Sequence, residues 1–274
     1  MSELDELDRA RARAVAGMYP TWEARYRTPE SERLQDEQMD DLVRLLDARP
    51  GTTVLDVGCG AGANAIRLAR RGVRVRAVDY AESVLEGTRA NVERAGVQEL
   101  VTIEREDLRD LSLPDASVER ALCWGVLMHI PEIERAIGEL SRVLAPGGRL
   151  AVCEGNIRSA DEIGLRVLDL FGRTTASTRT ASGRERWRDT PAGPLLARRT
   201  DIRWLIDAFG REDLELRARL PHQFTEAFIF MRSGSLPARL THELNRAWAH
   251  RVKSPRLAST NFVVFEKRAD PAPR

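Results

Sequence analysis

The chain has 274 residues, a length that suits one large domain or one domain carrying an insertion. With 42% hydrophobic and 31% charged residues, its composition is that of an ordinary globular protein and excludes the disordered, collagen-like and membrane-embedded classes. The 43 Lys and Arg and 42 Asp and Glu leave a net charge of +1, which excludes a whole-molecule field that would gather nucleic acid or anionic membrane. We therefore expect neither partner unless a local patch supplies one.

The first residues and the cysteines indicate where the protein resides. Residues 1–10 carry acids and no apolar run, so a signal peptide is not expected. The longest uncharged apolar run, at 121–130, falls short of the ~20 residues that a membrane-spanning helix needs. Cys59, Cys123 and Cys153 occur in no metal-binding spacing and are expected to be reduced and buried. These features predict a cytoplasmic protein.

Segment 1–50 is expected to form an N-terminal helical lid. Apolar residues recur at helical spacing over 3–18 and again over 32–48. An aromatic and proline-rich stretch separates the two helices, and in it Tyr19 and Tyr26 flank Trp22. We expect these aromatic residues either to close over a bound ligand, with Tyr19 contacting the acceptor, or to pack against the first helix.

Segment 51–156 is expected to form the ligand-binding core. Short β-branched runs alternate there with helical stretches, a pattern typical of parallel βαβ units. The expected strands are 52–57, 73–79, 100–106, 117–124 and 149–154, and the expected helices are 63–71, 82–95 and 133–144.

The βα alternation breaks after residue 155. Segment 157–212 indicates an insertion, with a helix at 162–171 and a mixed stretch of Arg, Thr, Ser, Gly and Pro, and we expect it to form a small cap over an acceptor. Segment 213–268 is expected to add a helical segment and the last sheet strands, at 214–220 and 261–267. The whole chain, 1–274, would then be a single domain.

A glycine-rich turn follows the first core strand. Gly58, Gly60 and Gly62 lie between that strand and a helix, where they let a ligand approach the backbone and where helix amides favour anionic groups. Asp79 ends the next strand 21 residues after Gly58, the offset at which an acid accepts hydrogen bonds from a ribose. The spacing also satisfies the dinucleotide pattern, so a nicotinamide cofactor is an alternative. Asp56 argues against it, because a carboxylate suits a cationic donor better than a pyrophosphate.

Four motifs in order resemble the class I S-adenosylmethionine-dependent methyltransferases: DVGCGAG, Asp79, the Glu106–Asp107–Leu108 run and LAPGGRLAV. The resemblance covers about 52–154. It implies an α/β fold with a Rossmann-like, doubly wound, seven-stranded sheet, mostly parallel with an antiparallel last strand, and S-adenosylmethionine as cofactor. Aminopropyl transferases are similar but need acids near strand four, which here ends in Cys123–Trp124–Gly125. The cofactor-binding residues that the resemblance implies are Asp56, Gly58, Cys59, Gly60, Gly62, Asp79, Tyr80, Glu106, Asp107, Leu108 and Trp124.

The sequence after strand four predicts a small-molecule acceptor, because it lacks the Asn/Asp-Pro-Pro-Tyr/Phe pattern that the family uses for planar amino groups. His129 follows this strand at the carboxyl edge of the sheet and is the expected general base, with a structural or steering role as the alternative. Glu154, Asn156 and His222 are further acceptor-site candidates. Glu154 and Asn156 offer too few oxygen ligands for a metal, so no metal is expected.

The insertion is rich in arginine, with seven arginines against Glu185 and Asp189 over 172–199. These side chains are either solvated or present guanidinium groups, including Arg184 and Arg186, to an anionic acceptor. We expect O-methylation of a sugar or sugar conjugate. The alternatives are O-, N- or C-methylation of a non-sugar natural product, and a donor-binding protein without transfer activity.

Overall fold

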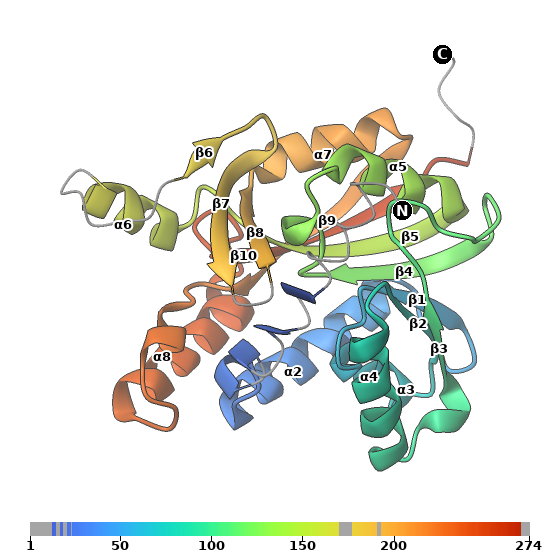
Figure 1. The fold of residues 1–274 in the computed structure, drawn as a ribbon, viewed down its shortest axis with the longest axis horizontal. Helices are drawn as coiled ribbons and strands as arrows, with labels where there is room; N and C mark the ends of the chain where they lie inside the picture. The colour runs from blue at the N-terminus through green and yellow to red at the C-terminus, as the bar shows by residue number, and fades with distance from the viewer. Residues whose placement is uncertain are drawn as a thin grey trace.

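One seven-stranded sheet organises the molecule (Figure 1). The computed structural model describes residues 24–169, 177–190 and 193–269, together with 13–14, 17–18 and 21–22. The strand order is β3-β2-β1-β4-β5-β10-β9, and β10 is antiparallel to both of its neighbours whereas the pairings among β1 to β5 are parallel. This confirms the predicted fold class. The strands are β1 (Thr53–Val57), β2 (Arg74–Asp79), β3 (Val101–Arg105), β4 (Val118–Trp124), β5 (Leu144–Gly155), β9 (Leu214–Gln223) and β10 (Thr260–Lys267).

Helices cover both faces of the sheet because its strands are apolar on both sides. One face packs against α2 (Pro29–Leu45), α3 (Ala63–Ala69) and α4 (Glu82–Arg94), and the other against α5 (Ile133–Val143) and α7 (Ile202–Arg211) (Figure 1). Leu68 and Leu85 are fully buried in the first core, and Leu205 and Phe209 in the second. Burial of each such side chain contributes ~1.5 to 3 kcal/mol to folding.

Helix α2 begins three residues before the predicted start at residue 32. Thr28 caps it, because the Thr28 hydroxyl oxygen accepts a hydrogen bond from the Ser31 amide at 3.3 Å. Pro29 occupies the first turn, where its missing amide proton costs nothing. The helix predicted over 3–18 lies almost wholly outside the described residues.

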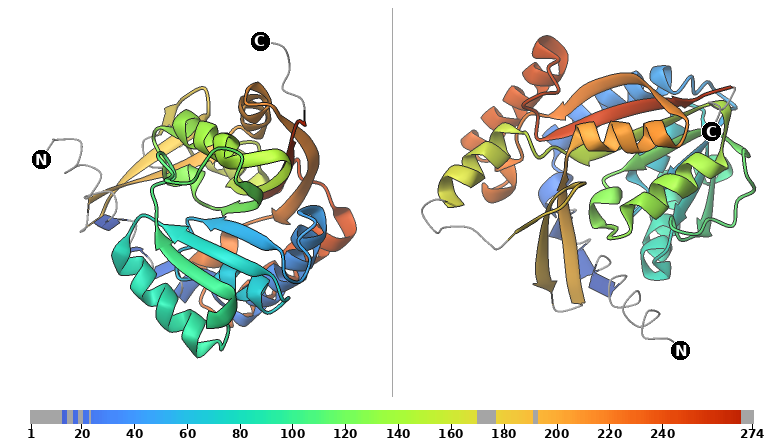
Figure 2. Two further views of the ribbon diagram at one scale, coloured as in Figure 1. Left: turned by 90° about the vertical axis from the view of Figure 1, so that its right-hand side faces the viewer. Right: turned by 90° about the horizontal axis from the view of Figure 1, so that it is seen from above.

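A second sheet, of three antiparallel strands, projects from the first (Figure 2). It consists of β6 (Thr178–Arg179), β7 (Gly183–Thr190) and β8 (Gly193–Thr200), in the stretch that the sequence indicated only as mixed. Charged pairs across the strands replace an apolar pattern: Glu185 lies opposite Arg198 in the register and forms an ion pair with it at 2.8 Å. The remaining elements are η1 (Gln98–Leu100), η2 (Leu127–His129), α6 (Ala160–Asp169), η3 (Ala227–Phe230), α8 (Leu236–Ala247) and η4 (Trp248–Val252).

Candidate functional site

A cavity of about 1040 Å³ opens at the carboxyl ends of the parallel strands, where doubly wound folds place their ligands. The ends of β1, β2, β4 and β5 line one side of it, and strands β7 and β8 of the small sheet line the other. Trp22 and Tyr26 of the N-terminal segment also reach the cavity, whereas Tyr19 lies outside the described residues. The sequence-predicted donor and acceptor regions therefore share one space.

The glycine-rich turn forms one wall of this cavity, and its conformation requires glycine. Gly58 has a φ angle of +65°, and a Cβ atom there would lie 2.4 Å from Cγ2 of Val126. Gly62 caps helix α3 with a φ angle of +82°, and its Cβ would lie 2.9 Å from Cγ2 of Thr88. The turn thus stays narrow. Gly58, Cys59 and Gly60 line the cavity, and the one side chain among them, that of Cys59, is buried.

Asp79 lines the cavity and also shapes the turn. Its Oδ2 accepts a hydrogen bond from the Gly60 amide at 3.1 Å, and its Oδ1 accepts one from the Ala81 amide at 3.1 Å. Burial nevertheless raises the pKa of Asp79 above its ordinary value. The carboxylate is fixed in position and retains lone pairs for further donors.

Asp56 lies beneath the turn and does not line the cavity. Both of its carboxylate oxygens are buried and make no hydrogen bond within the described residues. Burial, and then the nearby Asp79, raise the pKa of Asp56 to about 7. A buried acid without a partner favours a cation nearby.

The acid pair after β3 lies in the cavity wall with most of its hydrogen bonds already made. Glu106 accepts hydrogen bonds from the amide of Ser112 at 3.0 Å and from the Ser112 hydroxyl. Asp107 pairs with the Arg109 guanidinium at 2.6 Å, which outweighs burial and lowers the pKa of Asp107. Leu108, the next residue, is buried, and Leu108 and Tyr80 line the same cavity.

His129 presents one ring nitrogen as a proton acceptor. Its Nδ1 lies 2.6 Å from the carbonyl oxygen of Leu196, and a carbonyl only accepts, so Nδ1 carries the proton and Nε2 keeps a lone pair. Trp22 stacks on the ring at 5.2 Å between centroids. Burial lowers the pKa of His129, so the imidazole is neutral at pH 7.

Arg198 is one of the seven arginines of 172–199 that were expected either to be solvated or to face an anionic acceptor. It is 1% exposed and donates to the carbonyl oxygens of Leu127, Ile130 and Pro131 at 3.0, 2.9 and 3.3 Å. It thereby fixes the loop that carries His129. No signal in the sequence distinguishes it from the other arginines of the same stretch.

Glu154 ends in the cavity as a second buried acid. It is 1% exposed, and neither carboxylate oxygen makes a hydrogen bond within the described residues. Burial raises the pKa of Glu154 to about 8, although the Arg198 charge lowers it in part. At pH 7 this side chain is mostly protonated and can donate a hydrogen bond.

His222 and Trp124 close the floor of the cavity together. Their rings meet edge to face with centroids 5.0 Å apart. Nδ1 of His222 lies 2.5 Å from Oε1 of Gln38, and burial lowers the pKa of His222 to about 3, so this histidine is neutral throughout the physiological range.

The predicted acceptor arginines are placed differently from one another. Arg186 lines the cavity, but its guanidinium forms a bidentate ion pair with buried Glu162 at 2.7 and 3.1 Å. Arg184 does not line the cavity and donates to Ser177 at 2.9 Å. An anionic acceptor in the cavity could pair with Arg186 only by displacing Glu162. Arg184 lies outside the cavity lining.

Asn156 also lies outside the cavity lining. Its amide donates to the carbonyl oxygens of Arg256 and Ala258 at 2.9 and 3.0 Å, and its side-chain oxygen accepts from the Arg158 amide. Asn156 therefore joins β5 to the segment before β10. Among the described residues, no three His, Cys, Asp or Glu side chains are grouped to hold a metal ion, and no helix is long and apolar enough to cross a bilayer.

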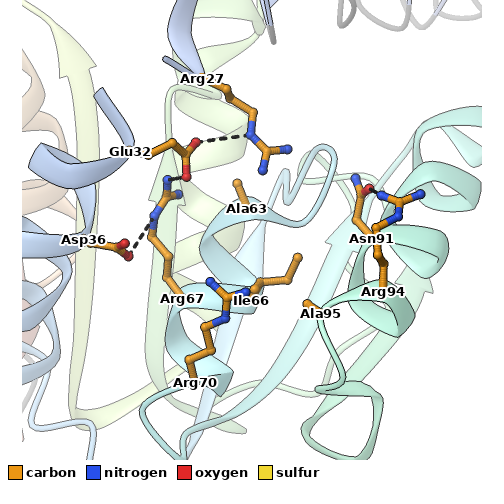
Figure 3. A pocket seen from close by; sticks show the side chains of 10 residues that line it. All are labelled: Arg27, Glu32, Asp36, Ala63, Ile66, Arg67, Arg70, Asn91, Arg94 and Ala95. Atoms are coloured by element: carbon orange, nitrogen blue, oxygen red, sulfur yellow. Dashed lines mark hydrogen bonds and ion pairs between the residues drawn. The ribbon is translucent and has the colours of Figure 1, made fainter. Parts of the chain in front are cut away.

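A second, smaller pocket of about 210 Å³ lies between α2, α3 and α4 (Figure 3). Arg67 is buried there and pairs with Glu32 at 2.6 Å and with Asp36 at 3.4 Å. These ion pairs fasten α2 to α3. Arg27 lines both pockets and bonds to Glu32, so the same network reaches the edge of the larger cavity.

Comparison with known proteins places this site in a family. Residues 55–152 match a methyltransferase domain. The methyltransferase GfsG of Streptomyces halstedii is 33% identical over 138 residues, covering 50% of each protein. The 27-O-demethylrifamycin SV methyltransferase of Amycolatopsis mediterranei (strain S699) is 37% identical over 114 residues, covering 41% of this chain and 42% of that protein. The chain thus spans about half the length, or less, of these curated relatives.

The fold has solved counterparts. The magnesium protoporphyrin IX methyltransferase of Synechocystis PCC 6803, solved with bound SAH, superposes with a TM-score of 0.62 at 16% identity, covering 96% of this chain and 99% of that one. The matched domain contains the glycine-rich turn, Asp79 and the strands that carry them. Residues 55–152 thus form a methyltransferase domain, and the seven-stranded sheet that carries them has the fold of the class I S-adenosylmethionine-dependent methyltransferases.

Proposed function

We propose that the protein transfers a methyl group from S-adenosylmethionine to a hydroxyl group of a small acceptor. The observation that carries this proposal is the single cavity, which joins the glycine-rich turn and Asp79 to His129. Donor and acceptor bound in one water-poor space can be aligned in line, and alignment alone can supply ~7 to 11 kcal/mol of barrier reduction.

The residues present fit the donor. The turn at Gly58 leaves no room for a Cβ, and the unpartnered Asp56 carboxyl lies beneath it, which suits a ligand with cationic groups. When bound, the donor supplies a methyl group on a positively charged sulfur. Asp79 would hold the ribose hydroxyls, Leu108 would pack on the adenine, and Asp107 would orient the loop around it.

His129 and Glu154 divide the acid and base roles. His129 would take the hydroxyl proton at Nε2, because the Leu196 carbonyl holds the other nitrogen protonated. Glu154, which burial keeps protonated, would donate a hydrogen bond to an acceptor oxygen and so hold the acceptor in place. Neither role requires a metal.

The cavity lining favours an amphipathic acceptor. Trp22, Met128 and Ile229 offer apolar surface, whereas Glu154 and Arg199 offer polar groups elsewhere in the same lining. A sugar conjugate, with a sugar hydroxyl near His129 and an apolar aglycone beyond it, would use both kinds of surface. The relative that acts on demethylrifamycin supports the non-sugar natural product as the second candidate.

The experiment is a transfer assay with radiolabelled S-adenosylmethionine and three matched acceptor sets: free sugars, apolar glycosides and the corresponding aglycones. We expect label in the glycosides above both other sets. Preferential labelling of aglycones would favour the natural-product alternative. Tight donor binding without label in any set would instead identify a donor-binding protein without transfer activity.

A further inference from the structure

Helix α8 exposes a row of leucines. Leu236, Leu240 and Leu244 are 68%, 61% and 45% exposed, and their spacing of four residues places them on one helix face. The opposite face of the helix is anchored in the protein, where Ala238 and Asn245 are buried. The leucines therefore lie on the outer side of a helix that is held in place.

Other exposed apolar side chains surround this row. Helix α6 lies at the same end of the molecule as α8 (Figures 1 and 2). The amide of Ala160, the first residue of α6, donates to the carbonyl oxygen of Leu257 at 3.0 Å, which joins α6 to the segment after α8. We call the following set the α6–α8 surface: Ile163, Val167, Phe230, Leu236, Leu240, Leu244, Val252 and Leu257, between 43% and 84% exposed. Only Trp187 and Leu216 are large exposed hydrophobic residues elsewhere in the described chain.

The segment that contains α8 is predominantly basic. Over 231–257 there are six basic residues and one acid, Glu243, in a chain whose net charge is +1. Arg246 pairs with Glu37 at 2.9 Å. The other five basic side chains are exposed and have no hydrogen-bond or ion-pair partner within the described residues; they are Arg232, Arg239, Arg251, Lys253 and Arg256.

We propose that the α6–α8 surface docks on an anionic lipid surface. Exposed leucines and a phenylalanine accompanied by unpaired arginines and a lysine are the combination that binds the boundary between headgroups and acyl chains. The balanced charge of the whole chain conceals this local patch. A second copy of the chain is disfavoured, because a symmetric contact would bring two sets of like charges together.

The large cavity opens toward the same surface. Phe230 is 84% exposed and, with Ile229, lines the cavity. Gly164 and Leu165 of α6 line it as well. A protein docked through the α6–α8 surface would thus present its cavity mouth to the lipid, where an amphipathic molecule gathers. This inference goes beyond the proposed transfer reaction and does not depend on it.

The test is co-sedimentation of the full chain, without donor or acceptor, with vesicles of phosphatidylcholine alone or with one-fifth phosphatidylglycerol. We expect binding to the anionic vesicles that weakens with added salt. Replacing Arg239, Arg251, Lys253 and Arg256 by Gln should weaken it by several hundredfold, since each of the four basic side chains contributes about fivefold. The double variant Leu240→Glu/Leu244→Glu should abolish it.

Matched controls lie away from the surface. Arg74→Gln/Arg211→Gln and Leu216→Glu change exposed residues of the same types and should bind vesicles like the parent, and S-adenosylmethionine binding reports whether each variant is folded. Equal binding to both vesicle types, or unchanged binding by the leucine variant, would overturn the proposal. So would dimerisation in sedimentation velocity that Leu240→Glu/Leu244→Glu removes, or binding to polyglutamate but not to vesicles, which would assign the surface to a second copy or an acidic protein.

Discussion

The carbonyl oxygen of Leu196 determines which ring nitrogen of His129 is free to take a proton. We expect His129→Ala to lower the single-turnover methyl-transfer rate by ~10² to 10⁴, because the acceptor hydroxyl loses its base. Donor affinity should stay near the parent value, since the proposed role of the histidine is toward the acceptor. Stopped-flow or quenched single-turnover measurements check this, with His250→Ala as the control. A rate near that of the parent would return His129 to a structural role.

Asp56 makes donor affinity depend on pH. Its pKa of about 7 means that below this pH the carboxyl is protonated and has no charge to attract a cationic donor. We expect S-adenosylmethionine affinity to rise by about tenfold per pH unit well below 7 and to level off above it. Calorimetry from pH 5.5 to 7.5 measures this slope.

Asp56→Asn should bind S-adenosylmethionine more weakly at pH 7.5 and lose the slope. Adenosine, which has no cationic group, is the control ligand, and its affinity for the parent should not show this slope with pH. The same slope for adenosine would show that another group titrates.

At the scale of single elements, the glycine-rich turn offers a test with an internal control. Gly58→Ala would place a methyl group 2.4 Å from Cγ2 of Val126, so the turn must shift and donor affinity should fall by at least tenfold. Adding Val126→Ala relieves most of the collision, leaving Cβ of residue 126 at 3.2 Å, but not the strain of the positive φ angle, and should restore part of the affinity.

Gly96→Ala isolates the strain in the same measurement. Gly96 has a φ angle of +69° with nothing near its Cβ position, so this variant should lose stability but keep donor affinity. If Gly58→Ala and Gly96→Ala affect donor binding equally, steric exclusion at the turn is not what admits the donor.

The strands that the sequence predicted differ from those it missed in their pattern of apolar and charged residues. β1 and β2 are mostly buried and each contains three apolar residues, and the β-branched runs at 52–57 and 73–79 indicated both. β7 alternates charged residues instead, and its pairing is visible only once Glu185 and Arg198 lie opposite each other. Helix α8 was expected only as a helical segment without bounds within 213–268, because its large apolar residues point outward and gave no core-facing pattern.

At the site, the motif positions could be predicted but their partners could not. Asp79 lines the cavity where its spacing placed it, yet its bond to the Gly60 amide depends on the turn's three-dimensional path. Arg186 reaches the cavity, but its pairing with Glu162 joins residues 24 positions apart that no local spacing connects. Charge counted along the sequence therefore overstated the positive charge available to an acceptor.

For the whole molecule, the buried Glu154 carboxyl ties stability to pH. Its folded-state pKa is about 8 and its ordinary value is 4.5, so between these values the native state binds more protons than the unfolded state. The Glu154 contribution to the free energy of unfolding therefore falls as pH rises through this window, by up to ~5 kcal/mol. Glu154→Gln keeps a neutral hydrogen-bonding group and should escape this loss.

Denaturant unfolding of parent and Glu154→Gln at pH 5 and pH 9 checks this expectation. The variant should gain stability over the parent at pH 9 and show little difference at pH 5. Glu119→Gln, at a side chain that is 74% exposed, is the control and should show no such change. If the variant is equally destabilised at both pH values, Glu154 stabilises the protein by packing, and its buried charge does not destabilise the protein at high pH.

The oxygen that orients His129 belongs to strand β8, on the opposite wall of the cavity from the sheet that carries the histidine. Arg198, also on β8, grips the carbonyl groups of the same histidine loop. Any movement that lifts this strand to exchange ligands releases both contacts and leaves the imidazole without a fixed tautomer. His129 would then be oriented to accept a proton only while the cavity is closed. An open, solvent-filled cavity would not hold an oriented base that could activate water next to the reactive sulfonium of the donor.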